Sequence, residues 1–151
     1  MIKTSEVNIP NLKFLLLDEK AVLPTYAHDG DAGFDLFSIE KIKLAPRETK
    51  LIHFGLAAEI PQDYFVSFRD KSGLASKFGL HVLGGVIDSG YRGEWIAIMI
   101  NLGKDDYTFQ VGDKVAQAIL QPAPQAEISK VTKFVEITTR GKGGFGSTGK
   151  K

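Results

Sequence analysis

The chain has 151 residues, of which 43% are hydrophobic and 25% charged, a composition that predicts one globular domain with a substantial core and excludes a disordered chain. Nineteen basic and eighteen acidic residues leave a net charge of +1, so no global field favours duplex nucleic acid or a membrane surface. The absence of cysteine excludes disulfides and thiolate metal sites, and three scattered histidines do not make a zinc site.

No apolar stretch is long enough to span a bilayer, and the N-terminus lacks the apolar core of a signal peptide. Together with the lack of cysteine, this predicts a cytoplasmic protein with no stable membrane or nucleic-acid partner. Any anion that the protein binds must be met by a local group of side chains and backbone N–H groups.

Helix signals are few, whereas glycine and proline interrupt the sequence at intervals that suit many short strands. Strands are predicted at residues 14–17, 51–56 and 64–69, the last from its alternating side chains. Residues 95–100 are all apolar, as expected of a strand that is covered on both faces. The pattern predicts an all-β fold.

The C-terminal half continues this series of short strands and turns. Turns are predicted at 101–106 and 111–114, followed by a strand or a short helix at 115–120. The prolines within 121–125 interrupt regular structure, and 128–137 is predicted to be a final strand. The expected architecture is a β-sandwich or barrel of the jelly-roll type.

Two connections carry groups that suit a metal ion and phosphates. The first, 29–35, has three carboxylates and two glycines, which fit either a solvated turn or a Mg²⁺ ion held mainly by phosphates. The second, 69–77, has three cations, two hydroxyls and a glycine. It fits either a solvated basic turn or a phosphate grip by Lys71, Ser72 and the Gly73 N–H.

The segment 84–94 combines a bare backbone with a carboxylate. Its glycine-flanked apolar strand leads to Asp88, and the following turn presents Tyr91. A ligand can approach closely there, so the backbone could read a base edge while Asp88 holds a water and acts as a general base. The alternative is a tight hairpin without a ligand. Further along, Gln117 taken alone fits a surface or capping amide.

The C-terminus, 140–149, places one aromatic ring, Phe145, among five glycines, with Arg140 at one end and two hydroxyls near the other. Such a tail stays mobile unless a ligand orders it, and its N–H groups, guanidinium and ring suit a flat, phosphorylated ligand. A P-loop is not expected, because that motif needs a following helix and only two residues follow Gly149; the alternative is a disordered terminus. The tail indicates a lid over a nucleotide.

Taken in order, five blocks of the sequence resemble the five motifs of the trimeric dUTP diphosphatase (dUTPase) family. The blocks are 32–35, 71–75, 85–93, 112–117 and the tail around Phe145. The resemblance implies an all-β jelly-roll of the dUTPase-like (β-clip) type, which assembles as a homotrimer with active sites at subunit interfaces. It also implies a catalytic domain, 1–139, and a flexible glycine-rich arm, 140–151, which closes over an active site of the trimer.

For function, the resemblance implies hydrolysis of dUTP to dUMP and pyrophosphate through attack of water on the α-phosphorus. This reaction keeps uracil out of DNA and supplies dUMP for dTMP synthesis. Asp88 would position and deprotonate the water, and the ring of Tyr91 would exclude a ribose hydroxyl. Asp35 would hold the implied cofactor, Mg²⁺, through ordered water.

The resemblance also implies which residues bind the substrate. Backbone groups near Gly85 and Ile96 would read the uracil edge, Phe145 would stack on the base, and Arg140 would meet the γ-phosphate. The implied substrate-binding residues are Lys71, Ser72, Gly73, Gly85, Val86, Ile87, Tyr91, Ile96, Gln117, Arg140, Phe145, Gly146 and Ser147.

One position departs from the family's usual pattern, and two other functions compete with dUTP hydrolysis. The family usually has arginine where Lys71 stands, and lysine lacks the bidentate fork, so we expect Arg69 to share the phosphate contact if its strand extends that far. A dCTP deaminase-like enzyme would need a glutamate ten residues beyond the motif aspartate, where this chain has Ile98. A non-catalytic nucleotide-binding protein would lack Asp88 or the arm, and the sequence has both.

Overall fold

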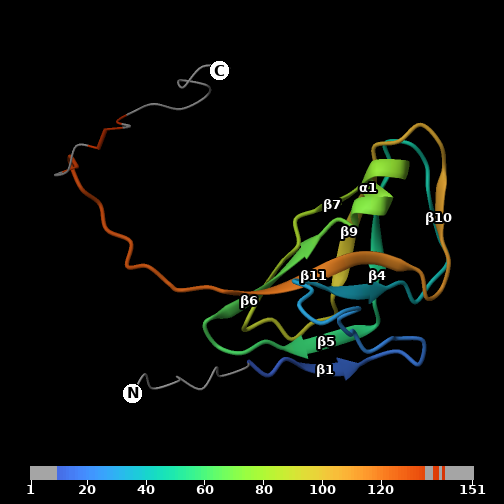
Figure 1. The fold of residues 1–151 in the computed structure, drawn as a ribbon, viewed down its shortest axis with the longest axis horizontal. Coiled ribbons are helices and arrows are strands. Elements are labelled where there is room, and N and C mark those ends of the chain that lie inside the picture. The colour runs from blue at the N-terminus through green and yellow to red at the C-terminus, as the bar shows by residue number, and fades with distance from the viewer. Residues whose placement is uncertain (1–9, 135–137, 140, 142–151) are drawn as a thin grey trace.

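The computed structural model describes residues 10–134, 138–139 and 141, and Figure 1 shows a body of strands with one short helix. This confirms the expected all-β fold. No helix among the described residues is long and apolar enough to cross a membrane. The elements are β1 (Lys13–Leu16), β2 (Phe34–Phe37), β3 (Ile42–Leu44), β4 (Thr49–His53), β5 (Leu56–Glu59), β6 (Tyr64–Arg69), α1 (Ser72–Phe78), β7 (Leu80–Leu83), β8 (Val86–Asp88), β9 (Ile96–Asn101), β10 (Tyr107–Phe109) and β11 (Lys114–Pro122).

Two sheets contain most of the strands. One has the order β2-β11-β6-β8 and the other β4-β9-β7, while β1 pairs with β5 and β10 pairs with β3 as two-stranded ribbons. Every one of these pairings is antiparallel. At the centre of the first sheet, β11 and β6 pair from Gln117 opposite Arg69 to Pro122 opposite Tyr64. This long ladder determines where the ends of the neighbouring strands lie.

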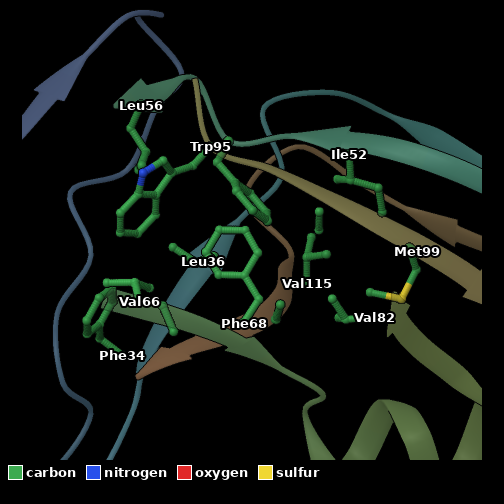
Figure 2. Packing of buried hydrophobic residues seen from close by; sticks show 14 of the residues in the cluster. Phe34, Leu36, Ile52, Leu56, Val66, Phe68, Val82, Trp95, Met99 and Val115 are labelled. Carbon is green, nitrogen blue, oxygen red and sulfur yellow. The ribbon is translucent and has the colours of Figure 1, made fainter. Parts of the chain in front are cut away.

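The hydrophobic core lies between the strands of both sheets, as Figure 2 shows. Phe68 comes from β6, while Phe54 and Trp95 flank strands of the second sheet. The Phe68 ring lies 5.5 Å from Trp95 and 5.8 Å from Phe54, measured between ring centroids. Burying a large apolar side chain stabilises a fold by about 1.5–3 kcal/mol. The burial of this aromatic cluster therefore stabilises the packing of the two sheets against each other.

The strand predicted at 51–56 is divided in two by a corner. β4 ends at His53 and β5 begins at Leu56, because Gly55 between them adopts a left-handed backbone with φ +64°. A Cβ at this position would lie 2.8 Å from the Cβ of Asp18, so the corner accepts only glycine. The ambiguous run at 115–120 is strand, within β11.

No helix is predicted at 69–77, yet α1 occupies most of this segment. Gly79 ends the helix in a left-handed conformation, and its N–H donates to the carbonyls of Ala75 and Leu74. Leu74 and Phe78 stand at helical spacing just before this glycine, which is the signal that indicates the helix. With seven residues, α1 is too short for this helix signal to stand out in the sequence.

The strand predicted at 128–137 is wrong for its described part, 128–134. This part has no strand, and Figure 1 shows the chain after β11 running away from the sheets. Ile128 is 96% exposed and Phe134 is 88% exposed. A strand requires a partner for its backbone hydrogen bonds, and none of the described strands pairs with this segment. An apolar pattern does not show whether a neighbouring strand is available for pairing.

One face of β9 is open in the single chain, although the sequence predicts cover on both faces. Ala97 and Met99 are buried, whereas Ile98 is 39% exposed. Leu51 on β4, which is half exposed, and Leu83 on β7 lie opposite Ile98 in register. These three residues, Leu51, Leu83 and Ile98, are named the β9 face.

Asn101 is fully buried and joins the end of β3 to the turn that follows β9. Its Nδ2 donates to the carbonyls of Leu44, at 3.1 Å, and Asp105, at 2.8 Å. Its Oδ1 accepts the N–H of Gly103 at 2.8 Å. The amide thereby fixes the turn that the sequence predicts at 101–106, and both of its ends are satisfied.

We expect Asn101→Ala to lower the free energy of unfolding by about 2–4 kcal/mol, because the Leu44 carbonyl and Gly103 N–H would lose their partner. Urea unfolding of the variant and the wild type measures this difference. Asn11→Ala, at an exposed position, is the control and should change little. Equal stability of the Asn101 variant would show that solvent replaces the amide without cost.

Candidate functional site

Two of the sequence blocks meet in one row across the first sheet, together with Arg69. Asp35 on β2 lies opposite Gln117 on β11, which in turn lies opposite Arg69 on β6. Side chains that are directly opposed in an antiparallel pair share a face and have Cβ atoms about 4.5–5.5 Å apart. The sequence predicts that Arg69 shares a strand face with Lys71 if the strand extends to Lys71. β6 ends at Arg69, so this condition is not met.

Asp35 stands between two lysines. Lys71 Nζ donates to its Oδ1, Lys114 Nζ lies 2.6 Å from its Oδ2, and the aspartate side chain is only 10% exposed. Burial alone would raise the pKa of Asp35, but the hydrogen bonds and charges of Lys114 and Lys71 outweigh burial and lower this pKa from its ordinary value. Asp35 is therefore ionised at neutral pH, and the three groups together carry one net positive charge.

The residues predicted to grip phosphates lie at the start of α1. Lys71 is the N-cap residue, and Ser72 and Gly73 open the first turn. This turn has no acidic side chain and no side-chain cap hydrogen bond. Nothing in the first turn therefore repels an anion that approaches beside Lys71.

Asp70 fixes the turn that leads into α1. Its Oδ1 accepts the N–H of Val82 at 2.7 Å, and its Oδ2 lies 2.8 Å from Nδ1 of His81. Its backbone carbonyl accepts a hydrogen bond from Nε2 of Gln117 at 2.9 Å. Gln117, predicted to bind phosphate, thus supports this turn in the structure.

A separate hollow surrounds Asp88, which is exposed at the end of β8. The hollow has a volume of about 180 Å³. Its lining includes four of the residues that the resemblance assigns to substrate binding, together with Asp88 itself and one residue not predicted. The lining residues are Val86, Ile87, Asp88, Tyr91, Glu94 and Ile96.

Two glycines shape the Asp88 hollow. Gly85 has φ +92°, and a Cβ there would lie 2.9 Å from the Cβ of Phe68. A Cβ on Gly93 would lie 2.4 Å from the phenolic oxygen of Tyr91. The Tyr91 hydroxyl donates to the carbonyl of Glu94 at 3.0 Å, and the side chain remains exposed to a ligand. The close approach of ring and backbone therefore depends on glycine.

These two groups of side chains do not meet within one chain. Asp88 lies opposite Phe65 on β6, whereas the row that contains Asp35 crosses β6 at Arg69. Four residues along a strand span about 13 Å, at about 3.3 Å per residue. One chain thus carries two candidate groups of site residues. One is the Asp88 hollow, and the other, named the Asp35 group, consists of Asp35, Lys71, Lys114 and Gln117.

Some predicted site residues lie outside the described part of the chain, and two candidate residues of the structure are not predicted from the sequence. Neither Lys114 nor Glu94 was predicted, because their partners Asp35 and His53 become neighbours only through strand pairing. Among the described residues, no group of three acidic or histidine side chains could hold a metal by itself. Four predicted substrate-binding residues lie outside the described part of the chain: Arg140, Phe145, Gly146 and Ser147.

Comparison with known proteins covers most of the chain. The family model described as dUTPase matches residues 19–149. A curated relative from Clostridium novyi (strain NT), named Deoxyuridine 5'-triphosphate nucleotidohydrolase, is 48% identical over 134 residues, which cover 87% of this chain and 94% of the relative.

Solved dUTPase structures have the same fold. The Staphylococcus bacteriophage 80alpha dUTPase with dUPNHPP matches with a TM-score of 0.88 at 29% identity, over 92% of this chain and 98% of that one. A mutant dUTPase from phage phi11 of S. aureus, described with a coordinated structural Mg(II) ion, matches with a TM-score of 0.79 at 29% identity, over 83% and 99%. The predicted dUTPase-like fold is confirmed, and the chain belongs to the dUTPase family.

Proposed function

We propose that this protein hydrolyses dUTP to dUMP and pyrophosphate, and so keeps uracil out of DNA and supplies dUMP for dTMP synthesis. The curated relatives carry the name of that activity, and the phage 80alpha dUTPase was solved with dUPNHPP, a dUTP analogue. The observation that carries the proposal is the Asp88 hollow. There, an exposed carboxylate and a tyrosine ring line a space shaped by close-packed glycines.

Asp88 is the general base of the proposed reaction. It lines the 180 Å³ hollow and a second hollow of about 560 Å³, so a water beside its carboxylate has room for a substrate on either side. Asp88 takes a proton from this water, whose oxygen forms a bond to the α-phosphorus. The bond from that phosphorus to the bridging oxygen breaks, and pyrophosphate leaves with the bonding electrons.

The nucleoside occupies the Asp88 hollow in this proposal. Backbone groups of Gly85 and Ile96 read the uracil edge, and Val86 and Ile87 line the space around it. The ring of Tyr91 lies against the sugar, where a ribose would carry its additional hydroxyl. A closed contact of this kind rejects a substrate whose extra polar group has neither room nor a partner.

The Asp35 group and the start of α1 bind the triphosphate. Lys71 and Lys114 provide positive charge, and Ser72 and the Gly73 N–H provide directed donors. When substrate binds, Lys71 exchanges the Asp35 carboxylate for a phosphate oxygen. Lys114 remains paired with Asp35, so the carboxylate keeps a compensating charge.

Mg²⁺ is the proposed cofactor, and the residues present fit an ion held mainly by phosphate oxygens. The Asp35 group offers one carboxylate, and the described residues form no three-ligand cluster that would hold a metal alone. Asp35 would contact such an ion through ordered water, and Gln117 beside it would bind the same phosphates after releasing the Asp70 carbonyl. The bound ion would neutralise charge on the triphosphate.

The proposed active form is a homotrimer with active sites at subunit interfaces. Within one chain, Asp88 and the row that contains Asp35 are about 13 Å apart along β6. This separation supports an arrangement in which the base beside the α-phosphorus and the groups that bind the phosphates come from different copies. The β9 face supplies an apolar surface for such contacts.

The C-terminal arm completes each site in this proposal. After β11, the chain leaves its own sheets with Ile128 exposed, which supports a path towards another subunit. Residues 1–139 would form the catalytic domain and 140–151 the arm. The arm residues proposed to contact the base and the phosphates are Arg140, Phe145, Gly146 and Ser147.

Incubation of the pure protein with Mg²⁺ and separately with dUTP, dCTP, dTTP and UTP tests the proposal. We expect dUMP and pyrophosphate from dUTP alone, resolved by anion-exchange chromatography, because base and sugar are both read by the Asp88 hollow. Conversion of dCTP would favour the deaminase-like alternative. No reaction with any of the four would favour a nucleotide-binding protein and overturn the proposed function.

We expect Asp88→Asn to lower kcat for dUTP by about 10²–10⁴-fold while substrate affinity remains similar, because the amide cannot accept the proton of the attacking water. Steady-state kinetics gives kcat, and titration with dUPNHPP gives affinity. Asp105→Asn, an exposed aspartate on the turn after β9, is the matched control. A fully active Asp88 variant would assign the base to another residue.

We expect the stabilisation by Asp35 to depend on pH. Because the pKa of Asp35 is lowered from 3.8 in the folded protein, its ionised form stabilises the fold above that value, and this contribution is lost as the pH falls below 3.8 through the folded-state pKa. Urea unfolding of the wild type and Asp35→Asn should differ most at neutral pH and least in acid. A difference that does not change with pH would contradict the ion-pair account.

A further inference from the structure

The position of the Tyr91 ring depends on two backbone groups that follow it. Its hydroxyl donates to the Glu94 carbonyl at 3.0 Å, and the ring lies so close to Gly93 that a Cβ there would be 2.4 Å from the phenolic oxygen. The side chain is otherwise exposed, and Tyr91 lines the hollow with Asp88. The contacts that hold the backbone at Glu94 therefore also determine the position of the Tyr91 ring.

Glu94 is anchored by its own carboxylate. Oε1 accepts the N–H of Gly55 at 3.0 Å, and Oε2 lies 3.0 Å from Nδ1 of His53. Both side chains of this pair are only partly exposed. The next residue, Trp95, continues the connection with a backbone bond from its N–H to the Leu56 carbonyl at 2.8 Å.

The anchor point at Gly55 is itself rigid. Gly55 has φ +64°, and a Cβ there would lie 2.8 Å from Asp18 Cβ, so the surrounding chain is closely packed against it. Its carbonyl accepts the N–H groups of Leu17, at 2.7 Å, and Asp18, at 3.2 Å. Because the chain is closely packed and hydrogen-bonded around Gly55, this corner gives the Glu94 carboxylate a fixed point of attachment.

We infer that Glu94, together with His53, is a positioning residue that fixes the Tyr91 ring and thereby sets the discrimination between deoxyribose and ribose. The inference rests on the proposed function for its substrate, and on the contacts above for its mechanism. Glu94 does not touch the reacting atoms. The backbone carbonyl of Glu94 accepts the hydrogen bond from the Tyr91 hydroxyl. The carboxylate of Glu94 accepts the N–H of Gly55 and so holds this carbonyl in place relative to the β4-β5 corner.

Three variants separate the parts of this arrangement. Glu94→Ala removes the carboxylate and leaves the Gly55 N–H without its acceptor, whereas Glu94→Gln retains an oxygen for that bond. His53→Phe keeps a flat ring but removes the nitrogen that faces Glu94. Glu59→Gln, which removes the charge of an exposed carboxylate paired with Lys13, is the matched control.

The first measurement is the ratio of kcat/KM for dUTP to kcat/KM for UTP. We expect Glu94→Ala to lower this ratio by about tenfold, His53→Phe to lower it less, and Glu94→Gln and Glu59→Gln to stay near the wild type. A loss of stability alone would lower both kcat/KM values together and leave the ratio unchanged. An unchanged ratio in Glu94→Ala would overturn the inference.

The second measurement does not need turnover. NMR spectra of protein with isotope-labelled tyrosine contain signals from four residues, and Tyr91→Phe identifies the signal of Tyr91. In Glu94→Ala we expect this signal to shift and broaden while the other three remain, and an unaltered Tyr91 signal would overturn the inference. If the wild type hydrolyses neither nucleotide, the proposed function fails, and the spectra still decide whether Glu94 holds the ring.

Discussion

The pairing of β6 with β11 on one side and β8 on the other is the constraint on which the site depends. Its ladder with β11 places Arg69 beside Gln117 and, through β2, beside Asp35. Its ladder with β8 places Asp88 at the opposite end of the same strand. A slip of one residue in either pairing would turn these side chains to the other face of the sheet. The positions of the Asp88 hollow and the Asp35 group thus both depend on the register of β6.

Charge is balanced locally in the Asp35 group. Two ammonium groups converge on one buried carboxylate, which limits their mutual repulsion and leaves a single net positive charge for an anion to meet. An ion pair of this kind costs desolvation, and the cost is offset only while each charge has a partner. In the proposed function, this favours an exchange of partners when phosphate arrives over a simple addition of phosphate to the paired lysines.

Strand periodicity made much of the fold predictable. The alternation at 64–69 and the apolar run at 95–100 correspond to β6 and β9, and Asp88 does end a short strand as expected. The sequence could not reveal α1, whose seven residues carry weak signals, or the absence of a strand at 128–134, where an apolar pattern has no paired neighbour. Contacts across the sheets, such as Lys114 with Asp35, follow from register, which no local pattern contains.

The burial of Trp95 has an optical consequence. It is the one tryptophan of the chain and is fully enclosed by the core, so its fluorescence reports the packing between the two sheets without interference from another indole. It also follows Glu94 directly in the chain, and its backbone N–H donates to the carbonyl of Leu56 at the start of β5. The protein thus carries an intrinsic spectroscopic probe one residue away from the wall of its Asp88 hollow.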